Sequence, residues 1–89
     1  MRDHVTVEIK YLAVLRDHTG RPAEEVTFPR GASLHDVAGW LEQRYALTLP
    51  APQLIATLNG YGWEQLREGL STRIQEGDVI CLFAPVAGG

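Results

Sequence analysis

The sequence contains one cysteine, Cys81, among its 89 residues. A single thiol excludes an internal disulfide framework, a four-cysteine zinc site and a four-cysteine iron–sulfur cluster. Because Cys81 falls within an apolar segment, we expect it to act as a small hydrophobic residue rather than a reactive thiol. The length suits one domain with a thin core, and the scarcity of cysteine suits a reducing compartment.

Basic residues are also few. Eight Lys and Arg against eleven Asp and Glu give a net charge of −3, whereas a nucleic-acid-binding protein usually has a strongly basic face. There is no long apolar run, and the polar start at residues 1–4 leads straight into an alternating segment, so neither a transmembrane helix nor a signal peptide is expected. We therefore expect a cytoplasmic protein with no nucleic-acid partner and no membrane partner.

Catalytic and metal-binding motifs are missing as well. His4, His18 and His35 have no partners at metal-ligand spacing, and no glycine-rich phosphate loop or dinucleotide motif is present. Ser33 has a helix-capping role available, which weakens its interpretation as a nucleophile. The sequence thus predicts no metal site, no bound cofactor and no enzymatic activity of its own.

Two segments near the start alternate between apolar and polar residues. Val5–Tyr11 has the period of two that is typical of a half-buried strand, and Glu24–Phe28 predicts a second, shorter strand. Leu12–His18 between them predicts a short helical turn, with Leu12 and Leu15 on one face. A brief connection of this kind allows the two strands to pair in antiparallel fashion.

The longest periodic segment follows. Ser33 and Asp36 form an N-terminal capping pattern for a helix over Leu34–Tyr45, whose apolar residues recur at helical spacing. Leu54–Leu58 and Val79–Ala84 then predict two further strands separated by turns.

This order of elements predicts an α+β fold of the β-grasp, or ubiquitin-like, type. One main helix would pack on a mixed sheet of four or five strands, with the first and last strands as central neighbours. Residues 1–84 would form the domain, and residues 85–89 a flexible, extended C-terminal tail.

The C-terminal tail is the segment that could take part in a chemical reaction. It reads Pro85, Val86, Ala87, Gly88 and Gly89; proline ends the strand, and the small residues let the backbone enter a narrow channel. The carboxylate of the last glycine is a poor acyl donor until adenylation by ATP converts it to a mixed anhydride that sulfide or a thiol can attack. The alternative is a frayed end without function.

The C-terminal segment 77–89 resembles the sulfur-carrier family of ubiquitin-like proteins, in particular the small subunits of molybdopterin synthase. Segment 7–20 is similar to the first strand of that family and its A-x-L-R-x-x-x-G segment, and residues 58–60 with 69–72 are similar to its middle. One departure is Ala84, where the family usually has proline.

The resemblance implies a mechanism and a set of partners. An adenylating enzyme related to ubiquitin-activating enzymes would use ATP to adenylate Gly89, and a sulfurtransferase system would convert the adenylate to a thiocarboxylate. The charged carrier would then insert its tail into the large subunit of the synthase, in a heterotetramer, and deliver sulfur to a pterin precursor of the molybdenum or tungsten cofactor. The large subunit would supply the catalytic residues.

The predicted last strand is apolar on both faces, although a single helix can cover only one. The helix-free face should therefore expose hydrophobic surface near the tail, with Phe83 and Leu12 as the partner interface. These two positions also match hydrophobic contact residues of the family. The alternative is that the segment Tyr61–Leu70, with Trp63, covers this face and makes Phe83 part of the core.

The sequence is also compatible with two other functions. The chain could carry sulfur for cysteine, thiamine or another sulfur metabolite, or it could be a β-grasp interaction module whose tail has no chemistry. An RNA-binding β-grasp domain is disfavoured by the charge, and a β-grasp ferredoxin is excluded by the single cysteine.

Overall fold

The computed structural model describes residues 3–85. Its elements follow in the order β1 (His4–Tyr11), α1 (Val14–Thr19), β2 (Ala23–Pro29), α2 (Leu34–Tyr45), β3 (Ile55–Leu58), β4 (Tyr61–Gly62), the 3₁₀ turns η1 (Trp63–Gln65) and η2 (Gly69–Ser71), and β5 (Val79–Phe83). No helix among these residues is long and apolar enough to cross a membrane.

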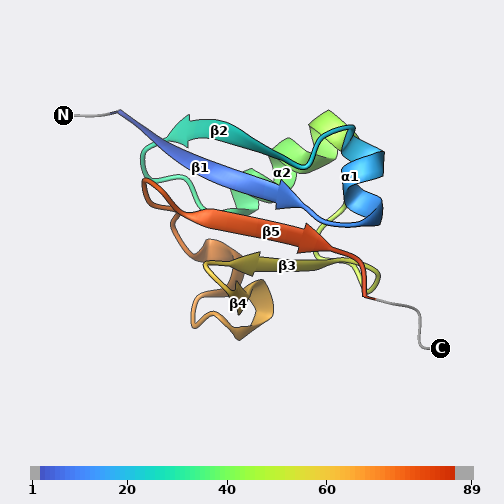
Figure 1. The fold of residues 1–89 in the computed structure, drawn as a ribbon. Helices are drawn as coiled ribbons and strands as arrows, with labels where there is room; N and C mark the ends of the chain where they lie inside the picture. The colour runs from blue at the N-terminus through green and yellow to red at the C-terminus, as the bar shows by residue number, and fades with distance from the viewer. Residues whose placement is uncertain (1–2, 86–89) are drawn as a thin grey trace.

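The five strands form one sheet in the order β2-β1-β5-β3-β4. β1 and β5 run parallel at its centre, and the other neighbours are antiparallel. Figure 1 shows α2 packed behind this sheet, with the front face free of helices. The predicted β-grasp fold, with the first and last strands as central neighbours, is confirmed.

The core lies between α2 and the back of the sheet. The alternating apolar residues of β1 all point into it, and so do Ile80 and Leu82 of β5, which are fully buried. α2 contributes the stripe of Leu34, Val37 and Leu41, each with no exposed surface. Burial of this apolar area is the main favourable term in the stability of the fold.

The main helix has the predicted bounds because its N-terminus is capped as the sequence indicates. The Ser33 hydroxyl accepts a hydrogen bond from the backbone N–H of His35 at 3.2 Å, and the Asp36 carboxylate accepts one from the N–H of Ser33 at 2.9 Å. These two bonds satisfy N–H groups that the first turn of a helix leaves without partners.

The first helix differs from the prediction: it begins at Val14 rather than at Leu12. Ala13 has φ 51° and ψ −123°, the geometry of the first central position of a type II′ turn, and the N–H of Leu15 donates to the carbonyl of Leu12 at 3.0 Å. The turn reverses the chain before the helix starts. Leu15 is consequently buried, while Leu12 does not share its face and is 45% exposed.

A polar cluster that the sequence patterns did not predict joins three elements. The Glu24 carboxylate of β2 accepts hydrogen bonds from the hydroxyls of Tyr11 on β1, at 2.7 Å, and Tyr45 on α2, at 2.5 Å, and it pairs with Arg21 at 3.2 Å. Burial and the adjacent carboxylate raise the pKa of Tyr11. Although burial opposes it, the two phenol hydrogen bonds, with the charges of Arg21 and Arg44, hold the pKa of Glu24 below its usual value.

Candidate docking surface and carrier tail

The helix-free side of the sheet carries apolar side chains where β5 ends. Residues of one strand alternate between faces, so Cys81 and Phe83 point away from the core that buries Ile80 and Leu82. Together with Leu12 and Ile55 they form what we call the open-face patch, consisting of Leu12, Ile55, Cys81 and Phe83.

Backbone pairing brings the patch together from three parts of the chain. Ile55 of β3 is the register partner of Phe83, and on the other side the N–H of Leu12 donates to the carbonyl of Leu82 at 3.0 Å. Leu12 is 45% and Ile55 37% exposed, while Phe83 is half-buried between them. The structure therefore places both predicted interface residues, Phe83 and Leu12, side by side at the end of β5.

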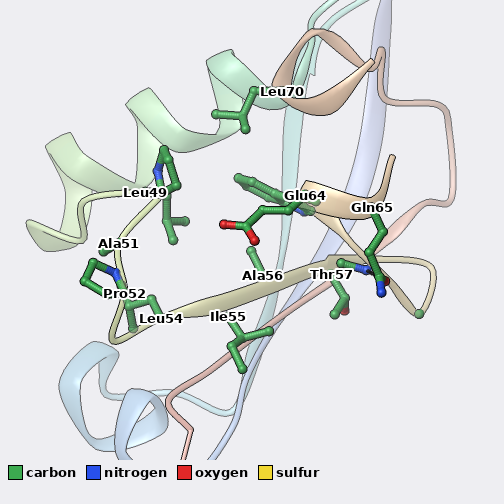
Figure 2. A pocket seen from close by; sticks show the side chains of 14 residues that line it. Leu49, Ala51, Pro52, Leu54, Ile55, Ala56, Thr57, Glu64, Gln65 and Leu70 are labelled. Atoms are coloured by element: carbon green, nitrogen blue, oxygen red, sulfur yellow. Dashed lines mark hydrogen bonds between the residues drawn. The ribbon is translucent and has the colours of Figure 1, made fainter. Parts of the chain in front are cut away.

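The segment considered as a cover for this face lies elsewhere. Trp63 is 4% exposed and belongs to the core, and Leu66 and Leu70 pack against that core from the helix side. A cavity of about 530 Å³ opens between this segment, β3 and the loop after α2. Figure 2 shows Ala56 pointing into the cavity and Ile55 pointing away from it, on the other face of β3. The open-face patch is thus uncovered by the described part of the chain.

Cys81 lies in the body of β5, as predicted, and its side chain is half-buried on the open face rather than in the core. Its register partners are Lys10 on β1 and Thr57 on β3. Three residues separate Cys81 from Pro85, so Cys81 belongs to the sheet and not to the predicted tail.

β5 ends at Phe83, two residues before the start of the predicted tail. Ala84 is half-buried and Pro85 is exposed, and proline has no N–H with which to extend the pairing. The other predicted tail residues, Val86, Ala87, Gly88 and Gly89, lie outside the described residues. The role of Gly89 as the reactive end therefore stays a prediction, and so does the boundary between domain and tail.

Within residues 3–85, no group of three or more His, Cys, Asp or Glu could hold a metal ion. The three histidines are exposed, and the Nε2 atom of His18 lies 2.7 Å from the carbonyl oxygen of Tyr45. The described surface offers apolar contact area beside the tail, which suits docking to another protein.

One patch residue was missed by the sequence patterns. Ile55 belongs to a run that is almost continuously apolar in sequence, but in the structure it points to the opposite face from Ala56, which is buried. The polar residue Thr57 could have indicated this. Residues two positions apart in a strand share a face, so Thr57 marks the face of Ile55 as the outer one.

The sheet order, with its parallel central pair and one main helix on a single face, defines a ubiquitin-like protein of the β-grasp class. The sequence profile of the ThiS family matches residues 9–89, and the chain belongs to this family. No protein of curated function matches the sequence significantly.

Several solved structures have the same fold. The Haloferax volcanii protein HVO 2177 is 26% identical with a TM-score of 0.80, covering 100% of this chain and 91% of that one. Small archaeal modifier protein 1 from Methanosarcina acetivorans is 25% identical with a TM-score of 0.77, covering 97% and 98%. A Pyrococcus furiosus protein described as subunit 1 of a molybdopterin converting factor is 24% identical with a TM-score of 0.77, covering 92% and 99%.

Proposed function

We propose that the chain is the sulfur-carrying small subunit of a molybdopterin synthase. An adenylating enzyme uses ATP to activate the carboxylate of Gly89, a sulfurtransferase system converts the adenylate to a thiocarboxylate, and the large subunit then takes the sulfur for a pterin precursor. The observation that carries the proposal is the open-face patch, which surrounds the end of the strand from which the tail continues.

The patch explains how a chain that relies on its partners for catalytic side chains, as we propose, can serve such a reaction. Burying Phe83 and Leu12 against a partner provides the binding free energy, because apolar area leaves water. The central strand fixes the start of the tail within the sheet, so docking the patch also positions the tail at the partner's active site. Orientation of this kind is a large part of what a carrier contributes to a reaction.

Membership of the ThiS family supports sulfur carriage in general. The finer assignment, to molybdopterin, is supported by the similarity of segment 77–89 to the small subunits of that synthase. The partners we propose are the adenylating enzyme, the sulfurtransferase and the large subunit, which together supply every catalytic side chain.

A second function has its own support. The 25% identity to small archaeal modifier protein 1, over nearly the whole of both chains, favours a carrier that serves another sulfur pathway or becomes joined to proteins. The same patch and tail would serve these uses, since each begins with activation of the terminal carboxylate.

The test is intact-mass spectrometry of the chain incubated with its adenylating enzyme, ATP and a sulfur donor. We expect one oxygen to be replaced by sulfur, with the label in the C-terminal peptide. Removal of Gly89 should abolish sulfur transfer and leave the melting temperature unchanged, and Gly88→Val should also block transfer, because a β-branched side chain restricts the backbone. Full transfer by the chain lacking Gly89 would refute the proposal.

The pathway is decided by the acceptor. The thiocarboxylate form should be offered in parallel to the molybdopterin synthase large subunit with its pterin precursor and to a cysteine synthase with its substrate. Sulfur transfer only in the first reaction supports the main proposal, and transfer only in the second assigns the chain to another pathway.

A further inference from the structure

The sequence contains a single lysine, Lys10, among its 89 residues. Apart from the N-terminal amine, it is therefore the one primary amine that the chain has. Lys10 lies on β1 with its side chain exposed, and alternation places it on the helix-free face, opposite the core residues Ile9 and Tyr11.

The position of Lys10 within the sheet sets it beside the open-face patch. Its register partner on β5 is Cys81, a patch residue, and its partner on β2 is Ala23. Both neighbours have short side chains, so neither shields the amine. In the part of the chain that the structure describes, no hydrogen bond or ion pair engages the ammonium group of Lys10.

The length of the tail allows an activated C-terminus to reach this amine on another copy. Six residues follow β5, from Ala84 to Gly89, and an extended chain of six residues spans about 20 Å. Strand alternation places Lys10 and the patch on the same face of the sheet, and Figure 1 shows that no helix covers this face.

We propose that Lys10 is an acylation site, and that the acyl donor is the activated C-terminus of a second copy of this chain. The inference rests on the proposed function, which supplies the Gly89 adenylate. The deprotonated amine of Lys10 attacks the carbonyl carbon of that adenylate, and the bond from this carbon to the AMP oxygen breaks. AMP leaves with the bonding electron pair, one proton passes to water, and the two chains are joined by an amide bond.

The linkage inactivates the acceptor as a carrier. A chain attached at Lys10 sits over Cys81 and its neighbours in the open-face patch, which the adenylating enzyme and the large subunit must contact. Docking of either partner conversely covers Lys10 and protects it from acylation. Sulfur carriage and self-linkage therefore exclude each other on a given molecule.

The experiment separates donor from acceptor. The donor is the Lys10→Arg variant with its tail intact, which keeps the charge but lacks the acceptor amine. The acceptor is the chain shortened by Gly88 and Gly89, which keeps Lys10 but cannot be activated. The two are mixed with the adenylating enzyme and ATP without a sulfur donor, and the products are analysed by intact mass and tandem mass spectrometry. The control acceptor is the same shortened chain with Lys10→Arg.

We expect a covalent heterodimer whose mass is that of the two chains less one water, with the branch at Lys10 and resistance to thiol reductants. The control acceptor should yield at least tenfold less dimer. A dimer that forms equally with the control acceptor, or one cleaved by thiols and therefore joined through Cys81, overturns the assignment.

A second experiment uses the native chain in two samples. Both contain the adenylating enzyme and ATP; the first also contains the sulfur donor, and the second does not. A thiocarboxylate in the first sample with no Lys10-branched dimer in the second leaves the proposed function standing and refutes this inference. If neither the thiocarboxylate nor the dimer forms, the proposed function is refuted, and the inference with it.

Discussion

Replacing Phe83 by alanine tests whether the open-face patch is an interface or part of the core. Full burial of a phenylalanine side chain is worth about 1.5–3 kcal/mol, and the ring of Phe83 is half-buried. Because part of the ring is accessible, we expect Phe83→Ala to lower the free energy of unfolding by about 1–2 kcal/mol, below the roughly 3–5 kcal/mol that truncation of a fully buried phenylalanine costs. Leu82→Ala, one residue away on the core face and with no exposed surface, should lower it by about 2–5 kcal/mol.

Phe83→Ala should weaken binding to the partners more than it lowers stability. Truncating an aromatic anchor near the centre of an interface typically lowers the binding free energy by about 2 kcal/mol or more, which weakens the dissociation constant by roughly 30-fold. The assays are urea unfolding for stability and titration calorimetry against the adenylating enzyme for affinity. Tyr61→Ala is the matched control, because Tyr61 is an aromatic residue that is 65% exposed and lies outside the patch. A core-sized stability loss for Phe83→Ala, or unchanged binding to the adenylating enzyme and the large subunit, would show that the reasoning is wrong.

Three further predictions concern residues around this surface. Ala13→Gly should raise the free energy of unfolding by about 1 kcal/mol in urea titrations, since a side chain at φ 51° is strained; a loss of stability would contradict this. Glu24→Gln should destabilise the fold by about 1–2 kcal/mol at pH 7. Because the folded pKa of Glu24 is lowered, its contribution is complete above the unfolded pKa of about 4.3 and is lost as the pH falls through the folded value, so the two proteins should converge in acid unfolding titrations. Cys81→Ala should keep sulfur transfer near its original rate and lower stability by about 1 kcal/mol; a persulfide on Cys81 during turnover would instead indicate a relay.

Much of the fold could be predicted from local patterns. The helix Leu34–Tyr45 has its predicted bounds because its cap at Ser33 and its apolar period are both encoded locally, within the helix and the one residue before it. The strand alternation at residues 5–11 was equally explicit. The short helix was placed two residues too early, because the turn at Ala13 uses a backbone conformation that alanine rarely adopts and that no composition signal marks.

Tertiary contacts were harder to predict. The pairing of Glu24 with two tyrosines joins residues 13 and 21 positions apart in the sequence, and no periodicity links them. The interface was predicted in part: Phe83 and Leu12 follow from a strand that is apolar on both faces, whereas Ile55 required the register of β3 on β5. A chain fold that brings distant strands together determines such contacts, and sequence spacing does not show them.

The topology explains why the patch lies at the end of β5. β5 is inserted between β1 and β3, so its end is held by backbone pairing on both sides. That insertion brings Leu12, from the start of the chain, and Ile55, from its middle, next to Phe83. Were β5 an edge strand, the tail would start with pairing on one side only, and one of these two neighbours would be absent. Because β5 lies at the centre of the sheet, backbone pairing holds its end in place on both sides, and apolar side chains flank that end on both sides.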